Sequence, residues 1–321
     1  MIALIGCGRW GRNLARNLQQ LGVLEMIVDP VLCEDQRPVG VTAPITRDLD
    51  VALGSPGVKG VVIAAPAVEH AGLAQRALEA GKHVFVEKPL AMTVEDAETV
   101  ADTARAQGLT LMVGHLLQYH PAFRRLVDVV RAGEIGKVRH IASNRLNPGA
   151  VRTEENALWS LAPHDFSMIL HLAGGYPTAV DALAVRVVNP DTPDRYVVTM
   201  QFGDSLTAQA DVSWISPYKE HRLTVLGDTG AVILDDHAGD AARKLVLYRG
   251  YIERAGGSPS FVKGSGEPLQ YGDAEPLRAE MEAFIAAVNG MAPTLTGPEE
   301  AIPVLRLLRQ ADAAAGTVGR A

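Results

Sequence analysis

A lysine that follows a short apolar segment has both the chemistry and the position expected of a catalytic group. Residues 83–87 read His-Val-Phe-Val-Glu, and Lys88 and Pro89 come next. An ammonium group beyond the end of a buried parallel strand can stabilise a developing oxyanion, or relay a proton if its pKa is lowered. The alternative is a surface lysine in a loop before a proline, and the residue types alone leave both open.

A histidine–aspartate pair is the second candidate for chemistry. His164 and Asp165 follow Pro163, and we expect a helix over residues 162–172, which puts His164 near a helix start. Neutral imidazole is the usual base for removing a hydroxyl proton near neutral pH. The chain has 9 histidines, so a structural role is the alternative for this one. Asp165 either orients a neighbour or caps the helix.

The N-terminal residues have the pattern of a phosphate cradle. Residues 2–5 predict a short buried strand, glycines follow at Gly6, Gly8 and Gly11, and a helix is expected from residue 12 to residue 21. The first glycine permits a tight turn, the second lets a pyrophosphate approach the backbone, and the third packs helix against strand. The N–H groups at the helix start favour phosphate. A glycine turn without a ligand is the alternative.

An acidic residue after the second apolar segment indicates which dinucleotide is bound. Asp29 ends the segment 23–28, at the spacing expected of a carboxylate that holds a ribose diol. No arginine or lysine stands next to it to hold a 2′-phosphate, which favours NAD over NADP. Arg37 lies close enough in sequence to reverse this preference.

These groups are expected on a two-domain α/β scaffold. Residues 1–118 alternate apolar strands with helices, which predicts a doubly wound parallel sheet, a Rossmann domain. Residues 119–321 predict a second α/β domain, for substrate binding and oligomerisation, with a large open mixed or antiparallel sheet. Its strands are expected at 138–146, 180–188, 196–202, 206–214, 220–226 and 231–234, and its last helices at 276–288 and 298–315.

Composition excludes several other classes of protein. The 321 residues carry 30 basic and 37 acidic side chains, a net charge of −7, so nucleic acid is not an expected partner. The two cysteines, Cys7 and Cys33, form neither a disulfide framework nor a zinc-binding pattern, and no metal site is expected. No apolar stretch has membrane-spanning length, so we expect a cytoplasmic protein without a membrane partner.

Three motifs together resemble the glucose–fructose oxidoreductase/inositol dehydrogenase (Gfo/Idh/MocA) family. They are the glycine turn, residues 80–89 (AGKHVFVEKP) and the later His164-Asp165. The resemblance implies NAD(P)-dependent oxidation or reduction of a sugar or cyclitol hydroxyl, with Lys88 and His164 as the catalytic residues. The implied cofactor-binding residues are Gly6, Gly8, Arg9, Trp10, Gly11, Asp29, Pro66, His70, Glu87 and Lys88. Many members carry an aspartate where this chain has Ser160, so proton relay is expected to rest on Lys88 and His164.

A narrower resemblance is to the nucleotide-sugar branch, which includes UDP-N-acetylglucosamine and UDP-N-acetylglucosaminuronate 3-dehydrogenases. It rests on residues 145–147, 152–156 and 159–165. An acidic protein that binds a diphosphate or a uronate needs local guanidinium groups. The expected substrate-binding residues are Tyr119, Arg145, Asn147, Arg152, Asn156, Trp159 and Asp165. The alternative is that the arginines are surface residues that pair with Glu154 or Glu155.

The expected reaction is hydride transfer between NAD and a sugar hydroxyl, at C3 of a UDP-N-acetylhexosamine or its uronate. One alternative keeps the fold and changes the substrate, as in a free-sugar or inositol dehydrogenase or a 3-ketosugar reductase. A non-catalytic NAD-binding protein is the more distant alternative. The strand-rich second domain suggests a homodimer or homotetramer, by analogy of fold.

Overall fold

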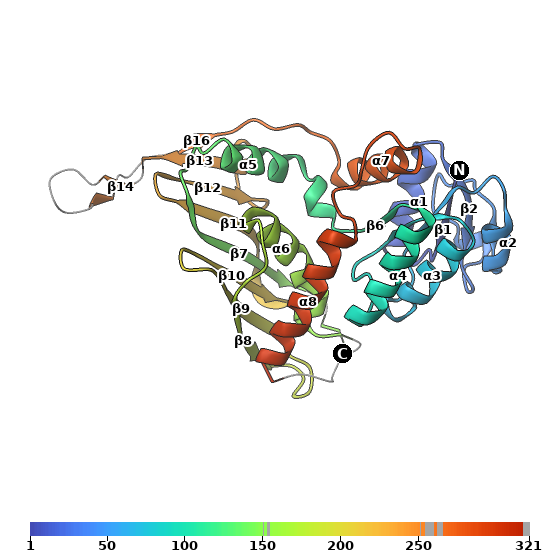
Figure 1. The fold of residues 1–321 in the computed structure, drawn as a ribbon, viewed down its shortest axis with the longest axis horizontal. Coiled ribbons are helices and arrows are strands. Elements are labelled where there is room, and N and C mark those ends of the chain that lie inside the picture. The colour runs from blue at the N-terminus through green and yellow to red at the C-terminus, as the bar shows by residue number, and fades with distance from the viewer. Residues whose placement is uncertain (150, 153–154, 251, 254–259, 262–265, 317–321) are drawn as a thin grey trace. The chain divides into compact units, whose positions relative to one another are not determined.

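The computed structural model describes residues 1–149, 151–152, 155–250, 252–253, 260–261 and 266–316 (Figure 1). The chain divides into two compact units. The first comprises Met1–Tyr119 and Ala274–Leu305, and the second comprises His120–Asp273 and the chain from Arg306 onward. None of the described helices is long and apolar enough to cross a lipid bilayer.

The first unit contains a six-stranded parallel sheet with the strand order β3-β2-β1-β4-β5-β6. The order reverses between β1 and β4, which is the topological switch point of a doubly wound sheet. The strands are β1 (Ile2–Ile5), β2 (Leu24–Val28), β3 (Ile45–Thr46), β4 (Gly60–Ile63), β5 (His83–Val86) and β6 (Leu111–Val113). The helices before the chain leaves this unit are α1 (Gly11–Gln20), α2 (Leu49–Gly54), α3 (His70–Glu79) and α4 (Val94–Gln107), with short 3-10 turns η1 (Glu34–Gln36), η2 (Ala67–Glu69) and η3 (Leu116–Tyr119).

Local sequence explains these elements. All four residues of β1 and of β4 are buried, as expected of strands covered on both faces. Thr93 caps α4, since its hydroxyl oxygen accepts a hydrogen bond of 3.1 Å from the Asp96 amide. Gly108 ends α4 in the left-handed conformation, at φ +64°. The predicted alternation of strand and helix is therefore confirmed for this sheet.

Helix α7 (Pro276–Val288) belongs to the first unit, although 154 residues of the second unit, 120–273, precede it in the chain. Its side chains Leu277, Met281 and Phe284 are buried in the core beside the sheet. The rings of Phe85 and Phe284 lie 5.9 Å apart. The sequence prediction assigned all of residues 119–321 to one domain; the structure instead returns residues 274–305 to the first unit. The amphipathic pattern predicts the helix but not the unit on which it packs.

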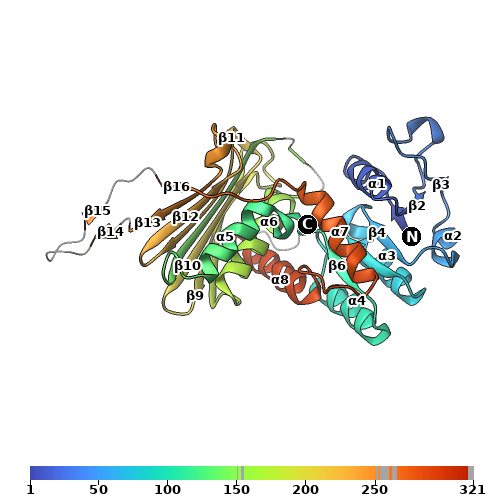
Figure 2. The ribbon, with the colours of Figure 1, turned by 90° about the horizontal axis from the view of Figure 1, so that it is seen from above.

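The second unit is built on an eight-stranded sheet with the order β16-β13-β12-β11-β7-β10-β9-β8 (Figures 1 and 2). Only the β7–β10 pairing is parallel; the others are antiparallel, which confirms the predicted mixed sheet. Its strands are β7 (Val138–Pro148), β8 (Ala179–Val185), β9 (Arg195–Phe202), β10 (Leu206–Ser213), β11 (Ile215–Gly227), β12 (Gly230–Asp235), β13 (Leu245–Arg249) and β16 (Glu267–Pro268). A separate pair is β14 (Ile252–Glu253) with β15 (Ser260–Phe261), and η4 is Ala241–Arg243.

Helices α5 (Pro121–Arg131) and α6 (Ala157–Ala173) pack on this sheet, and α8 (Pro298–Ala314) runs from the first unit into the second. Helix α6 begins five residues earlier than predicted. Asn156 caps it by accepting a 3.1 Å hydrogen bond from the Trp159 amide, and Pro163 lies inside the helix rather than at its start. The expectation that His164 sits near a helix start is therefore wrong: it lies within the helix.

Candidate active site

The glycine turn of the first unit has the geometry of a phosphate cradle. Gly6 adopts φ +86°, and a Cβ atom there would lie 2.7 Å from the Ala64 carbonyl oxygen. A Cβ at Gly11 would collide with the Gly6 carbonyl oxygen. At Gly8, by contrast, a Cβ would meet no atom within 4 Å. The backbone of Gly8 thus faces open space directly before α1, where a diphosphate fits against the N–H groups of the helix start.

Asp29 holds this turn together from the end of β2. One carboxylate oxygen accepts a 2.7 Å hydrogen bond from the Cys7 amide, and the other accepts 2.9 Å bonds from the Val31 and Leu32 amides. Burial raises the pKa of Asp29, but these three N–H donors and the Arg12 charge outweigh it, so its pKa lies below the usual range. A carboxylate that stays ionised in this place suits a ribose diol.

Arg37, which could have favoured NADP, is used within the protein. Its guanidinium pairs with Glu34 and donates to the Ala43 carbonyl oxygen. The first contact is an i,i+3 ion pair, with the Arg37 side chain 23% exposed. The basic side chain nearest to Asp29 in sequence is therefore already paired locally.

His70 joins the loop after β4 to the loop after β5. Its ring nitrogens lie 2.9 Å from the Ala65 carbonyl oxygen and 2.7 Å from that of Pro89, and the residue is 1% exposed. Burial lowers the pKa of His70, so the ring is neutral and donates to only one of the two carbonyls. Pro66 is next to Ala65 in the chain, and Pro89 is next to Lys88. The contacts of the His70 ring with the Ala65 and Pro89 carbonyls therefore fix the backbone beside the expected catalytic lysine.

Glu87 is tied to the glycine turn. Its Oε1 accepts a 2.5 Å hydrogen bond from the Trp10 indole nitrogen, and its Oε2 lies 3.4 Å from the Lys88 amide nitrogen. A Cβ at position 114 would lie 2.9 Å from that same oxygen, so only Gly114 leaves room for the carboxylate. Lys88 itself is partly buried. These contacts bring together the residues after β1 and β5 in one unit, at the carboxyl ends of the strands.

His115 is a member of this cluster that sequence reasoning missed. It lies two residues after β6 and is 2% exposed, and its Nδ1 lies 2.5 Å from Glu300 Oε2. Burial raises the pKa of Glu87, while Trp10, Lys88 and His115 oppose the shift. The sequence signal for His115 was its position just after a strand of the parallel sheet, because the ligand binds at that edge in such sheets.

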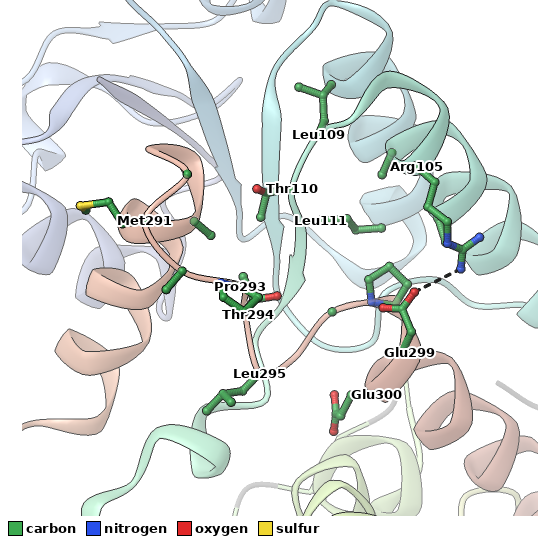
Figure 3. A pocket seen from close by; sticks show the side chains of 17 residues that line it. Arg105, Leu109, Thr110, Leu111, Met291, Pro293, Thr294, Leu295, Glu299 and Glu300 are labelled. Atoms are coloured by element: carbon green, nitrogen blue, oxygen red, sulfur yellow. Dashed lines mark ion pairs between the residues drawn. The ribbon is translucent and has the colours of Figure 1, made fainter.

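A cavity of about 610 Å³ lies elsewhere in the first unit, beside the edge strand β6 (Figure 3). It is lined by the end of α4, by residues 109–111 and by the segment between α7 and α8. Arg105 and Glu299 form an ion pair of 3.5 Å at its wall. None of the expected cofactor-binding residues lines it, so this cavity is separate from the glycine turn.

In the second unit, Asp165 and Arg145 form a buried ion pair. Arg145 Nε and Nη2 donate to the Asp165 carboxylate at 2.7 and 3.2 Å, and Ser143 Oγ donates at 2.5 Å. Asp165 is fully buried and Arg145 is 8% exposed. The pair joins α6 to β7 next to His164, which is partly buried. A large part of the Arg145 donor capacity is therefore committed inside the protein.

Asn147 contacts His221, which forms a ring pair with His237 that the sequence did not suggest. Its Oδ1 lies 2.9 Å from His221 Nε2, and the His221 and His237 rings are 4.9 Å apart. Burial, followed by the Arg145 and Lys219 charges, lowers the pKa of His221 to about 3. The imidazole is neutral at physiological pH and positions the Asn147 amide. The strand register, which places His221 opposite Arg145, is visible only in the structure, so the sequence offered no signal for this pair.

Four other expected substrate-binding residues have partners within their own unit. Asn156 Nδ2 and Trp159 Nε1 donate to the two carboxylate oxygens of Asp312, at 3.3 and 3.0 Å. Tyr119, in the first unit, makes a 3.2 Å hydrogen bond to the Thr296 hydroxyl, and burial raises its pKa to about 12. Arg152 pairs with Glu155, as the alternative for the arginines anticipated. The roles of these residues toward a substrate stay predictions, as do those of Lys88, in the first unit, and His164, in the second.

The chain resembles known proteins over nearly its full length. Residues 1–115 match the Gfo/Idh/MocA oxidoreductase family model of an NAD-binding Rossmann fold, and residues 123–233 match the C-terminal domain model of that family. A protein of known structure from Magnetospirillum magnetotacticum MS-1 is 30% identical, with a TM-score of 0.84 over 96% of this chain and 97% of that one.

Relatives with named substrates include the following two. UDP-N-acetylglucosamine 3-dehydrogenase of Acidithiobacillus ferrooxidans is 25% identical over 90% of this chain and 89% of its own, and its structure superposes with a TM-score of 0.83. The scyllo-inositol 2-dehydrogenase (NAD(+)) of Bacillus subtilis is 25% identical over 72% of each chain. Across several curated relatives, the aligned part spans from 59% to 89% of their lengths. This chain belongs to the Gfo/Idh/MocA family of NAD-binding oxidoreductases.

Proposed function

We propose that this protein is an NAD-dependent dehydrogenase that oxidises the C3 hydroxyl of a UDP-N-acetylhexosamine or its uronate. The observation that supports the substrate class is the match to the A. ferrooxidans 3-dehydrogenase, which extends over 90% of the chain, against 72% to 83% for three inositol dehydrogenases. The cofactor preference is supported by the ionised Asp29 and by the engagement of Arg37 with Glu34.

Different residues of the chain have chemical or positioning roles in the proposed reaction. NAD, when bound at the glycine turn, would supply the hydride acceptor for the sugar carbon. The His164 imidazole takes the hydroxyl proton, and the Lys88 ammonium stabilises the negative charge that develops on the oxygen. His70 and Glu87 hold the loop that carries Lys88, and Asp165 fixes the helix that carries His164 through its bonds to β7.

A panel of substrates tests the proposal. NADH formation would be followed by absorbance with UDP-N-acetylglucosamine, its uronate, free hexoses and inositols. We expect kcat/KM for a UDP-sugar to exceed that for any free polyol by about a hundredfold or more, because truncated substrates lose binding energy used in the transition state. Equal or faster oxidation of inositols would contradict the substrate assignment. NAD binding without any turnover would contradict both the substrate assignment and the proposed dehydrogenase activity.

A free-sugar or inositol dehydrogenase is the second candidate, and one observation favours it. The Arg145 guanidinium is neutralised by Asp165, and Arg152 pairs with Glu155, so neither arginine is free to bind a diphosphate without giving up a partner. Arg152→Ala distinguishes the two candidates. It raises KM for a UDP-sugar if the arginine contacts the diphosphate and leaves KM for a polyol unchanged. Arg139→Ala is the matched control, since Arg139 is also an exposed, ion-paired arginine of this unit.

One exchange tests the cofactor preference. Asp29→Ala should weaken NAD binding more than NADP binding, because the carboxylate is proposed to hold the ribose diol as well as the turn; an equal loss for both would contradict the preference.

We also propose a homodimer or homotetramer that uses the eight-stranded sheet. Leu183 of β8 and Tyr218 of β11 are exposed there, at 62% and 57%. Light scattering on the purified protein would give the mass, and a monomer would contradict this proposal.

A further inference from the structure

The cavity beside β6 has the size and the walls of a small-molecule site (Figure 3). Its volume of about 610 Å³ falls in the usual range for such sites, about 300–1,000 Å³. Helix α4, strand β6 and the segment from the end of α7 to the start of α8 all contribute, so the cavity lies entirely within the first unit. The walls are mainly small or apolar side chains, among them Ala101, Ala104, Leu109, Ala287, Ala292 and Pro298.

The outer edge of β6, which faces away from β5, is only partly paired. On the inner edge, the Val84 amide donates a 2.8 Å hydrogen bond to the Thr110 carbonyl oxygen. Successive residues of a strand direct their backbone groups to opposite edges, so Leu111 and Val113 face outward. The Val113 amide donates to the Thr296 carbonyl oxygen at 2.8 Å. Because β6 is the last strand of its sheet, no strand lies opposite Leu111.

Leu111 therefore presents a backbone N–H and a C=O side by side at the cavity that it lines. A Cβ at Gly297, another lining residue, would lie 3.8 Å from the Leu111 carbonyl oxygen, which places this oxygen at the cavity wall. Leu111 is 3% exposed, and its backbone makes no hydrogen bond with any residue that the structure describes. Buried backbone groups are almost always paired. A molecule in the cavity would supply the missing partners.

The charged side chains of the lining are already paired. Arg105 lies 2.5 Å from Asp102 and 3.5 Å from Glu299. Glu300 lies 2.5 Å from His115. An ionic ligand would have to replace one of these partners, whereas an uncharged ligand leaves them in place. The cavity thus favours a neutral molecule, bound through apolar contacts and through one donor and one acceptor.

We propose that this cavity is a second small-molecule site, separate from the glycine turn, for a neutral flat heterocycle with an amino donor beside a ring-nitrogen acceptor. Adenine has such a pair. The amino group donates to the Leu111 carbonyl oxygen, and the ring nitrogen accepts from the Leu111 amide. The ring itself lies among the small side chains of α4 and of the segment after α7, where Ala104 and Ala292 leave room for it.

Adenine binding to the full-length protein, with NAD at saturation, tests the proposal. Saturating NAD occupies the dinucleotide site, so adenine that still binds does so elsewhere. We expect adenine to bind about tenfold more tightly than unsubstituted purine, which lacks the amino donor and leaves the Leu111 carbonyl oxygen unpaired. Calorimetry measures both affinities. Three results would each overturn the proposal: no adenine binding, loss of adenine binding once NAD is added, or equal affinity for purine.

Amide hydrogen exchange, read by NMR, locates the bound adenine without any variant. The Leu111 amide has no partner in the structure and should gain protection by about tenfold or more when adenine binds. The Val113 amide is the internal control, because it is already bonded to Thr296 and should change little. Adenine binding without new protection at Leu111 would overturn this site.

Ala292→Phe tests the same location by filling the cavity. Ala292 is an exposed member of the lining, so a larger side chain there need not disturb the core. We expect adenine affinity to fall by about tenfold or more and NAD affinity to persist. Ala80→Phe is the matched control, because Ala80 is an exposed alanine at the end of α3 and does not line the cavity. Adenine affinity that is unchanged in Ala292→Phe would contradict the proposal.

Discussion

The Trp10 indole nitrogen donates a 2.5 Å hydrogen bond to the Glu87 carboxylate, across 77 positions of sequence. The contact links the turn after β1 to the loop after β5, so the proposed cofactor cradle and the proposed catalytic lysine are parts of one hydrogen-bonded structure. Trp10 is 42% exposed, so this hydrogen bond holds an indole at the protein surface.

Replacing Trp10 tests that link. Trp10→Phe keeps an aromatic ring and removes the N–H donor, so Glu87 loses a partner that lowers its pKa. Because the site is partly exposed, we expect a loss of about 1 kcal/mol, or roughly fivefold in NAD affinity. Fluorescence or calorimetric titration with NAD measures it. Unchanged affinity, with an unchanged melting temperature, would show that the bond contributes to neither binding nor stability.

Removing the Lys88 amine tests the proposed chemistry. Lys88→Ala should reduce single-turnover hydride transfer by about 10²- to 10⁴-fold, the usual contribution of a positioned acid or base. NAD binding should survive, because the glycine turn and Asp29 are untouched. Rapid-mixing absorbance of NADH measures the transfer step and calorimetry measures binding. Retention of hydride transfer at the parent rate would refute the role of this lysine.

The Arg145–Asp165 pair should matter for stability. Asp165→Asn leaves a buried guanidinium without its counter-charge, and breaking a buried ion pair in this way costs about 3–5 kcal/mol. Urea denaturation followed by circular dichroism gives the change in free energy of unfolding. Glu155→Gln is the control, since it breaks the more exposed Arg152 pair and should cost less than about 1 kcal/mol. Similar costs for the two variants would contradict the structural assignment.

His221 should make the protein sensitive to mild acid. Its pKa is about 3 in the folded protein, against about 6.5 for an unfolded histidine. The unfolded chain therefore binds a proton that the folded chain rejects, so stability is present above about pH 6.5 and declines as the pH falls toward the folded pKa. His221→Gln should show a smaller loss of urea stability between pH 7 and pH 5 than the parent protein. An equal loss in both would assign the acid sensitivity to other groups.

The glycine spacing and the alternation of apolar segments were sufficient to predict the Rossmann-type sheet, because both patterns are local. The start of α6 was not predicted correctly. Pro163 suggested a first turn, since proline is favoured there, but the Asn156 side chain caps the helix six residues earlier than the expected start at 162, and the helix tolerates the proline inside.

Pairings over long distances escaped prediction for a different reason. Arg145 and Asp165 lie 20 residues apart on a strand and a helix, and neither motif indicates that they neutralise each other. Glu280 of α7, which is 1% exposed, was overlooked as one of many acidic residues. Its spacing from Leu277, Met281 and Phe284 was visible in the sequence, and a carboxyl group on an otherwise apolar helix face is a signal that can be searched for in other chains.

The discontinuity of the first unit has a consequence for biosynthesis. Strand β6 is an edge strand whose Val113 amide donates a 2.8 Å hydrogen bond to the Thr296 carbonyl oxygen. On the ribosome, residues 1–119 emerge long before this partner and before the side chains of α7 that complete the core. The edge strand of the nascent N-terminal sheet therefore stays unpaired while the whole intervening unit is translated. We expect chaperones to bind the nascent chain mainly in that interval.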